Sequence, residues 1–416
     1  MTTTHYDTLE SRSVEQREAA LLAALPLQIA HARTASPAFA DILAGIDPAL
    51  ITSRAGLATL PVTRKHELLE RQQAGRARNV FGGFSTVGFG VAMPRVFSSP
   101  GPMYEPEGKR PDYWRMARAI HAAGFRSGEL IHNCFSYHFV PAGSMMESGA
   151  RALGCTVFPG GTGQTEQQVQ AMADLKPAGY IGTPSFLKII VEKAAEMNVS
   201  LPSVTRALVS GEAFTPSLCD WLAERGIAGY QCYATADLGL IAYETETRQG
   251  LVLDEGVMVE IVRPGTGDPV AEGEVGELVV TTLNPDYPLI RFGTGDLSAV
   301  LPGACPSGRT NTRIKGWMGR ADQTTKVRGM FVHPAQVADV VRRFPEAIKA
   351  RLVVSGEMAN DSMNLLVETS SAPEGLTKRI GDAIRDVTKL RATVQLCTPG
   401  SLPNDGKVIE DARSYQ

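Results

Sequence analysis

The stretch Leu-Ile-His-Asn-Cys-Phe at residues 130–135 is a short apolar run that follows helix signals at residues 113–123. A run of this length beside a helical segment is typical of a buried strand. The same alternation continues, with further strands expected at residues 156–158, 179–181, 207–209 and 229–233. Strands that alternate with helices indicate a largely parallel sheet with covered faces. The sequence therefore predicts an α/β fold with βα-layered sheets.

The segments around this alternation have different patterns. Residues 1–75 read as helical, with Thr63 as a candidate N-cap, and the α/β core is expected over residues 76–255. Residues 76–108 within it are rich in Gly, Ser and Pro, which is typical of a long irregular segment with a functional role. Residues 256–320 predict a β-rich subdomain, and a smaller α+β pattern follows. We expect a large N-terminal domain of residues 1–320 and a small C-terminal domain of residues 321–416.

Composition narrows the class of function. The chain has 416 residues and a net charge of −3, which gives no electrostatic reason to expect nucleic acid or an anionic membrane as a partner. No stretch approaches the roughly 20 apolar residues of a membrane span. The N-terminus has no basic-then-apolar signal pattern, and the six cysteines are scattered. These features predict a protein of the reducing cytoplasm.

Familiar nucleotide and metal signatures are weak. The sequence has neither a G-x-x-x-x-G-K-[ST] loop nor a clean G-x-G-x-x-G after a strand. His132, Cys134 and His138 share one face of a strand and are candidate zinc ligands, although a strand of core residues is the more common outcome. Cys305 resembles half of a zinc knuckle in which Ser307 replaces the second cysteine, so a turn is the better interpretation.

Two aspartates and one lysine are stronger candidates. Asp237 lies just beyond the strand that ends near Tyr233, and Asp296 follows an apolar strand that runs into a glycine-rich turn at residues 288–295. Ligands of open α/β sheets bind at such strand ends, where a carboxylate can hold Mg²⁺ or accept from sugar hydroxyls. Each aspartate alone could instead be a helix cap or turn residue. Lys407 follows a Pro…Gly turn, where a solvated surface lysine is the common case.

The order and spacing of these sites resemble the phenylacetate–CoA ligase branch of the adenylate-forming superfamily, from about residue 61 to residue 413. The segments that carry the resemblance are residues 112–114, 131–137, 153–157, 182–185, 233–237, 288–296, 319–334 and 402–407. The resemblance implies that MgATP and a carboxylic acid form an acyl-adenylate, and that the thiol of coenzyme A then displaces AMP. It also implies that the small C-terminal domain swings between the two steps.

The resemblance assigns roles to individual residues. Tyr233, with Ala234 beside it, corresponds to the aromatic at the adenine, and Ser210, Gly211 and Glu212 correspond to the strand end that lines the nucleotide. Asp237 corresponds to the Mg²⁺-binding Glu, and Asp296 to the acceptor of the ribose hydroxyls. Arg320 corresponds to an arginine near the ribose, Asp322 to the hinge, and Arg328 and Gly329 to the loop that faces the thioester-forming site. Lys407 corresponds to the lysine that meets the carboxylate and the α-phosphate during adenylation.

One segment departs from the family pattern. The phosphate-binding loop of the family reads like Ser-Ser-Gly-Thr-Thr-Gly-Lys-Pro, whereas residues 98–109 here read Ser-Ser-Pro-Gly-Pro-Met-Tyr-Glu-Pro-Glu-Gly-Lys. Prolines lack the N–H donors of a phosphate cradle, and Glu105 and Glu107 add negative charge. Ser98 and Ser99 remain candidates for phosphate binding.

The leading hypothesis is an ATP-dependent ligase that joins a carboxylic acid, expected to be aromatic, to coenzyme A. Phe135, Tyr137 and Phe186 are candidates for the wall of an acyl pocket, although they could equally be core residues. The alternatives are adenylation with transfer to a carrier-protein pantetheine, and a non-catalytic acyl- or nucleotide-binding homologue with a degenerate phosphate loop. The resemblance also suggests a homodimer.

Overall fold

The computed structural model describes residues 4–263, 267–321, 323, 325–328, 330–332, 334–356, 360–403 and 408–413. The described chain divides into two compact units. The large unit comprises Met1–Phe214, Leu218–Thr294 and Ser298–Trp317, and the small unit comprises Thr215–Ser217, Gly295–Leu297 and Met318–Gln416. The expected domain boundary at residues 320/321 stays a prediction.

The main sheet of the large unit is mixed, with the strand order β14-β15-β10-β9-β8-β7-β6-β4-β5. Its strands are β4 (Leu130–Asn133), β5 (Thr156–Pro159), β6 (Gly179–Gly182), β7 (Arg206–Val209), β8 (Ala228–Thr235), β9 (Gly239–Glu244), β10 (Leu251–Leu253), β14 (Val300–Leu301) and β15 (Arg313–Ile314). Strands β5, β4, β6, β7 and β8 pair in parallel, and β9 pairs antiparallel with β8. The helices between the parallel strands are α6 (Ala142–Ala152), α7 (Thr165–Leu175), α8 (Pro184–Glu196) and α9 (Pro216–Ala223). The predicted α/β fold is confirmed.

A second sheet has the order β1-β13-β12-β11 and joins distant parts of the chain. Its strands are β1 (Thr63–Arg64), β11 (Val257–Val262), β12 (Gly276–Thr282) and β13 (Phe292–Ser298). Strand β1 pairs in parallel with β13, so that Thr63 is opposite Phe292. This pairing brings the N-terminal helical region to the β-rich segment near residue 290.

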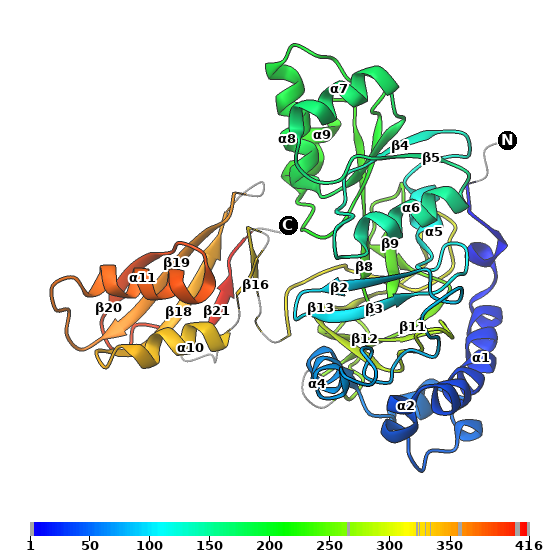
Figure 1. Cartoon of the computed structure of the whole chain (residues 1–416), viewed down its shortest axis with the longest axis horizontal. Coiled ribbons are helices and arrows are strands. Elements are labelled where there is room, and N and C mark those ends of the chain that lie inside the picture. The colour runs from blue at the N-terminus through cyan, green and yellow to red at the C-terminus, as the bar shows by residue number, and fades with distance from the viewer. Residues whose placement is uncertain are drawn as a thin grey trace. The chain divides into compact units, whose positions relative to one another are not determined.

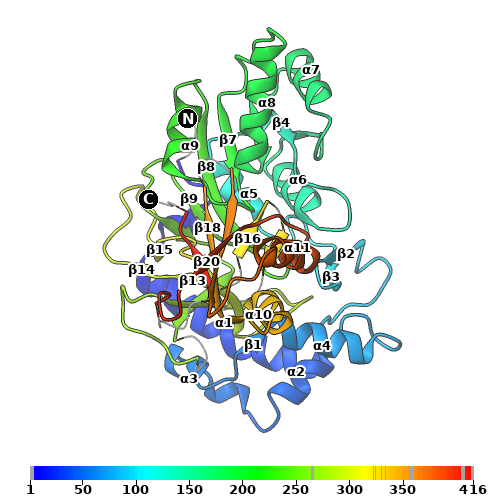
Figure 2. The ribbon, with the colours of Figure 1, turned by 90° about the vertical axis from the view of Figure 1, so that its left-hand side faces the viewer.

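The N-terminal region is helical, with η1 (Thr8–Ser11), α1 (Val14–Ala35), α2 (Pro37–Ile42), η2 (Pro48–Leu50), α3 (Arg54–Ala58) and α4 (Lys65–Gly75). Helix α1 begins at a capping box, in which Ser13 and Gln16 satisfy each other's backbone N–H groups. Helices α1 to α4 lie together at one end of the large unit, away from α7 and α8 (Figures 1 and 2). The expectation that Thr63 caps a helix is wrong, because Thr63 lies in β1 and the N-cap of α4 is Arg64.

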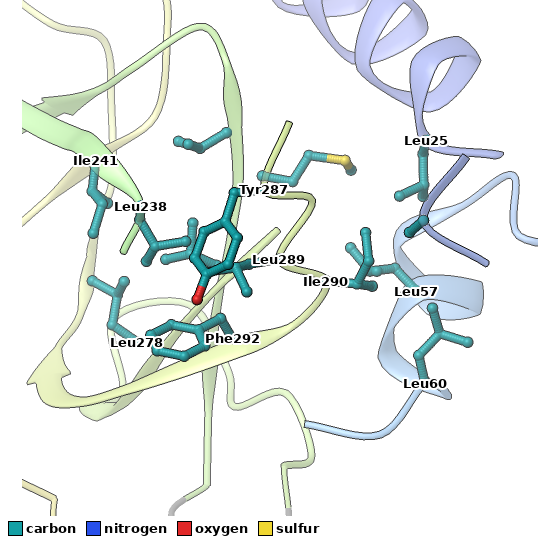
Figure 3. Packing of buried hydrophobic residues seen from close by; sticks show 14 of the residues in the cluster. Leu25, Leu57, Leu60, Leu238, Ile241, Leu278, Tyr287, Leu289, Ile290 and Phe292 are labelled. Atoms are coloured by element: carbon teal, nitrogen blue, oxygen red, sulfur yellow. The ribbon is translucent and has the colours of Figure 1, made fainter. Parts of the chain in front are cut away.

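These helices pack on the second sheet through a buried apolar core. Leu25, Leu57 and Leu60 approach Ile290 from the helical side, and Tyr287 and Phe292 lie beside Leu238 and Leu278 (Figure 3). Such burial is the main stabilising term for elements this short, which could not persist alone in water. The core therefore fixes β13 and the turn after β8 relative to α4.

The sequence predicted that residues 76–108 are irregular, and this prediction is wrong for part of the segment. They contain the antiparallel hairpin of β2 (Arg95–Ser99) and β3 (Met103–Glu107), which pairs Ser99 with Met103. Helix α5 (Met116–Ala122) follows it. No helix in the described part of the chain is long and apolar enough to cross a membrane.

The small unit has its own core. Its sheet has the order β20-β19-β18-β21, with β18 (Ala347–Ser355), β19 (Ser362–Thr369), β20 (Thr393–Cys397) and β21 (Ile409–Asp411). Helices α10 (Pro334–Arg343) and α11 (Leu376–Thr388) contact this sheet, and a ribbon of β16 (Thr325–Val327) and β17 (Met330–Val332) precedes them. Buried side chains such as Val340, Leu352 and Ile384 fill the interface between helices and sheet.

Candidate functional site

Asp237 lies in the tight turn that joins β8 to β9. The Leu238 N–H donates to the Thr235 hydroxyl at 3.1 Å, which closes the turn. Gly239 has a φ of +73°, and a Cβ atom there would lie 2.8 Å from the Trp114 carbonyl oxygen. Only glycine suits both conditions without strain. The turn therefore holds Asp237 at the end of β8, where it is 5% exposed.

The buried Asp237 carboxylate is paired with Lys65. The Lys65 Nζ atom lies 2.9 Å from Asp237 Oδ2, and the side-chain exposure is 45% for the lysine and 1% for the aspartate. Lys65 is the first residue of α4, where a positive charge opposes the helix dipole. The ion pair compensates for that placement. Sequence reasoning missed Lys65, although a lysine in the first turn of a helix was a detectable signal.

The β2–β3 hairpin brings Glu105 to the same region. The Ser99 N–H donates to Glu105 Oε2 at 3.2 Å, and the Ser99 hydroxyl donates to Glu105 Oε1. Burial, followed by the Asp237 carboxylate, raises the pKa of Glu105 to about 8. Burial also raises the pKa of Tyr287, with smaller contributions from Asp237 and Glu105. Ser99, Glu105, Asp237 and Lys65 therefore form one electrostatic cluster.

Asp237 has the chemistry of a Mg²⁺ ligand. Its second oxygen, Oδ1, is buried and has no hydrogen-bond partner among the described residues. Mg²⁺ prefers carboxylate oxygens and is usually held by one or two of them together with substrate phosphates and water. Groups of three or more acidic, His or Cys side chains suited to a metal are absent from the described residues. Asp237 thus fits the expected role.

Two of the three zinc candidates, His132 and Cys134, contact the side chain of Gln168. The His132 Nε2 atom lies 2.6 Å from Gln168 Oε1, and the same oxygen accepts a weak bond from the Cys134 thiol at 3.7 Å. His138 is exposed. Gln168 itself donates to the carbonyl groups of Gly160, Gly161 and Gly163, so this cluster shapes the loop after β5.

The nucleotide candidates of the large unit gather at the ends of β7 and β8. Ser210 follows β7, and its hydroxyl donates to the Cys232 carbonyl of β8 at 2.8 Å. Because β7 and β8 are parallel neighbours, Ser210 to Glu212 and Tyr233 to Ala234 lie at the same edge of the sheet. A Cβ atom at Gly211 would lie 3.8 Å from the Phe135 ring. The structure thus brings Phe135 to the strand end expected to line the nucleotide.

The three aromatic pocket candidates do not share one cluster. Phe135 is buried with the residues of α5 and α6, whereas Phe186 packs with the core between β6 and α8. The Tyr137 hydroxyl accepts from Asn133 Nδ2 at 2.8 Å, and burial raises the pKa of Tyr137. Only Phe135 has a described approach to the Gly211 segment, so the acyl-pocket wall stays a prediction.

Asp296 and Arg320 are paired within the small unit. The Arg320 Nη1 atom lies 2.8 Å from Asp296 Oδ1, and the two residues also form a β-bridge. Asp296 lies inside β13, so its expected place in a glycine-rich turn after a strand is wrong. Gly295 has a φ of +72°, and a Cβ atom there would lie 2.5 Å from Arg320 Nη2. Glycine therefore allows the arginine to reach its partner.

The remaining site candidates are Arg328, which the structure describes, and three residues that it does not describe. The Arg328 N–H and guanidinium donate to Asp361, at 3.0 Å to its carboxylate and 2.7 Å to its carbonyl oxygen. Lys407, Asp322 and Gly329 lie outside the described residues. Their expected roles stay predictions.

Comparison with known proteins gives two family matches in chain order. The model of the AMP-binding enzymes matches residues 113–284, and the model of their C-terminal domain matches residues 329–411. The phenylacetate-coenzyme A ligase of Thermus thermophilus is 31% identical over an alignment of 396 positions, which covers 86% of this chain and 87% of the relative. The phenylacetate-coenzyme A ligase of Escherichia coli is 28% identical over a gapped alignment of 438 positions, which covers 98% of this chain and 97% of the relative.

Solved structures show the same similarity. A crystal structure of 2-hydroxyisobutyryl-CoA ligase with 2-HIB-AMP and CoA, in its thioesterification state, has a TM-score of 0.78 and 25% identity. The comparison covers 99% of this chain and 93% of that one. The postadenylation state of the same ligase with 2-HIB-AMP gives a TM-score of 0.73 at 25% identity, over 98% and 92% of the two chains.

Proposed function

This chain belongs to the AMP-binding enzymes, together with the phenylacetate–CoA ligases. From this membership we propose which of its residues take part in the ligase reaction. The enzyme is an AMP-forming acid–CoA ligase: it activates a carboxylic acid with ATP to an acyl-adenylate and then forms the acyl-CoA thioester. The observation that carries this conclusion is the 31% identity that extends over 87% of a phenylacetate-coenzyme A ligase.

In the first half-reaction, a carboxylate oxygen attacks the α-phosphate of ATP, and pyrophosphate leaves. Asp237 would hold Mg²⁺ through its buried unpartnered oxygen, while Lys65 fixes the other oxygen. An ion held there would supply positive charge to offset the charge of the phosphates. Lys407 lies against the α-phosphate, where an ammonium fixed in a water-poor site stabilises the charge of the transition state.

The proposal assigns the adenine and the ribose of the nucleotide to different residues. Tyr233 and the Ser210–Glu212 segment lie at neighbouring strand ends and accommodate the adenine, which the parallel pairing of β7 and β8 supports. Asp296 accepts from the ribose hydroxyls and is oriented by its ion pair with Arg320. In the second half-reaction, the small domain, residues 321–416, turns about Asp322, withdraws Lys407 and presents the segment of Arg328 and Gly329 to coenzyme A.

We also propose the class of acid, the acceptor thiol, the oligomeric state and the compartment, which the similarity to known ligases does not specify. The acid is aromatic, since Phe135 offers a ring beside Gly211, with Tyr137 and Phe186 as further wall candidates. A carrier-protein pantetheine is the alternative acceptor, because it ends in the same thiol arm as coenzyme A. We propose a homodimer in the cytoplasm; the six cysteines are all free, which suits a reducing compartment.

The reaction is tested by incubating the protein with MgATP and a panel of aliphatic and aromatic carboxylic acids. Pyrophosphate release is expected with at least one acid, and AMP release is expected to accelerate when coenzyme A is added. A carrier protein bearing pantetheine, supplied instead of coenzyme A, separates the two acceptors. If no acid gives pyrophosphate and calorimetry detects no ATP binding, the chain is a non-catalytic homologue.

Lys407→Ala tests the assignment of the first half-reaction. Removal of a charge that is fixed at the developing negative charge is expected to slow acyl-adenylate formation by about a hundredfold or more. The reaction of preformed acyl-adenylate with coenzyme A should keep its rate, because Lys407 is withdrawn in that step. Pyrophosphate release and thioester formation are measured separately, and an unchanged rate of pyrophosphate release would refute the role.

A further inference from the structure

The β2–β3 hairpin occupies the position of the phosphate loop in the sequence, yet the donors of Ser98 and Ser99 already have acceptors. The Ser99 N–H and hydroxyl both donate to the Glu105 carboxyl group. At the tip, Pro100 and Pro102 have no N–H to offer. A loop that binds phosphate needs several donors that converge on one empty position. At Ser99 that position is already filled by the two oxygens of Glu105.

Neighbouring contacts hold the hairpin in this arrangement. The Tyr104 N–H donates to Gln72 Oε1 at 2.8 Å, and Gln72 Nε2 donates back to the Tyr104 carbonyl oxygen at 2.9 Å. Gln72 is fully buried in α4. The Ser98 N–H donates to the Phe139 carbonyl oxygen at 2.8 Å. Both strands are therefore tied to the body of the large unit, and the Ser99–Glu105 contact is part of a rigid framework.

Glu105 is also suited to remain in place. Glu105 is only 1% exposed, so water does not replace its hydrogen-bond partners. The Ser99 N–H donates to one of its oxygens and the Ser99 hydroxyl to the other, so the hydrogen bonds of the hairpin hold both oxygens at the Ser99 donors.

We propose that Glu105 is a specificity-determining residue that takes the place of a phosphate group at the Ser99 donors, so that this chain binds the β- and γ-phosphates of ATP weakly at the hairpin. The inference rests on the proposed function, together with the expectation from the family pattern that residues 98–109 bind the ATP phosphates. It implies an enzyme with ordinary affinity for AMP and acyl-adenylate, which lack those phosphates, and with a weak preference for ATP over AMP.

The test compares the dissociation constants of MgATP, inorganic pyrophosphate and AMP by calorimetry. Glu105→Ala and Glu105→Thr free the Ser99 donors and are expected to bind MgATP and pyrophosphate about tenfold more tightly, which is the effect of regaining one hydrogen bond to a charged group. Their AMP affinity should not change. Glu105→Gln keeps one of the two accepting oxygens and should therefore show a smaller gain in affinity for MgATP and pyrophosphate, with AMP affinity unchanged.

Two control variants separate this effect from a general change in charge or folding. Glu107→Gln removes a carboxylate from the same hairpin, where it pairs with Arg95 at 2.6 Å, and should leave every affinity unchanged. Ser99→Ala in the otherwise wild-type protein should not weaken MgATP binding, because Glu105 already uses its hydroxyl. In combination with Glu105→Thr, Ser99→Ala should cancel part of the gain. Thermal unfolding of each variant confirms that it is folded.

The outcomes distinguish the inference from the function on which it rests. Unchanged or weaker MgATP binding in both folded Glu105 variants, or weaker binding in Ser99→Ala alone, overturns the inference. Lack of AMP binding together with no thioester formation from acyl-adenylate and coenzyme A overturns the proposed function instead. Tighter MgATP binding in Glu105→Thr with unchanged thioester formation supports both.

Discussion

The Lys65–Asp237 pair shows how one residue contact defines the site. The two residues are 172 positions apart in sequence, and the contact exists only because β1 pairs with β13 and carries α4 to the turn after β8. An aspartate this deeply buried needs a partner, because the desolvation of an uncompensated charge is costly. Lys65 supplies that partner from the rim of the site while remaining partly in water.

Lys65→Met removes the counter-charge and should destabilise the protein by about 1–3 kcal/mol, because Asp237 would be left buried without its strongest partner. Urea unfolding measures the change. Lys65→Arg keeps a positive charge and is the matched control, with a smaller loss expected. Equal stability of Lys65→Met and the wild type would show that Asp237 is protonated or solvated instead of paired.

Asp237 itself was predictable from the sequence, whereas its surroundings were not. Its position after a strand of an α/β pattern places it at the sheet edge, and that much follows from local sequence. Its partner Lys65 and its neighbour Glu105 arrive from other elements, and a single sequence does not specify such contacts. Lys407, whose role follows from the family resemblance alone, lies outside the described residues.

At the scale of elements, local signals were reliable where they were periodic. The strand expected at residues 130–135 is β4 (Leu130–Asn133), which lies in an apolar run of the length typical of a buried strand. The hairpin β2–β3 was missed, since its Gly, Ser and Pro content is typical of loops. It is a strand pair because contacts with α4 and residue 139 override local preference.

Helix α5 carries a buried histidine, His121, whose burial has a consequence for stability at low pH. His121 is buried, and its ring meets the edge of Tyr6 at 5.8 Å. Burial, followed by repulsion from Arg126, lowers the pKa of His121 from 6.5 to about 4. Smaller contributions come from Glu10, which favours the charged form, and from Arg309 and His5, which oppose it.

The sign of the pH dependence follows from linkage. Between pH 6.5 and about 4 the unfolded chain binds a proton at this histidine, whereas the folded protein does not. Stability should therefore fall as the pH falls through this window. His121→Gln should show a shallower slope of unfolding free energy against pH in urea titrations. Identical slopes for the variant and the wild type would mean that His121 is protonated in the folded state.

At the scale of the whole molecule, Gln323 of the small unit contacts the backbone that follows Lys407, the lysine proposed to act in adenylation. Gln323 follows Asp322, and its Oε1 atom accepts from the Val408 N–H at 2.8 Å and from the Ile409 N–H at 3.4 Å. Lys407 immediately precedes Val408. Within the small unit, Gln323 thus anchors the backbone at Val408 and Ile409, directly after Lys407 in sequence.

Gln323→Ala should slow acyl-adenylate formation roughly three- to tenfold, as expected for the loss of a hydrogen bond worth about 1 kcal/mol that positions Lys407. Thioester formation from preformed acyl-adenylate should be unchanged. Gln323→Glu keeps the accepting oxygen and should restore the rate. Gln336→Ala, which removes another amide of the small unit, is the matched control. Equal slowing of both half-reactions would indicate a merely structural role.

The parallel pairing of β1 with β13 also has a consequence for biosynthesis. Thr63 and Arg64 emerge from the ribosome long before their partners Phe292 and Gly293 are made. At about 5–20 residues per second, the delay is on the order of ten seconds or more. During that time the apolar face of the N-terminal helices lacks its native cover. Nascent chains of this protein are therefore expected to depend on chaperones that shield such surfaces until residue 293 has been translated.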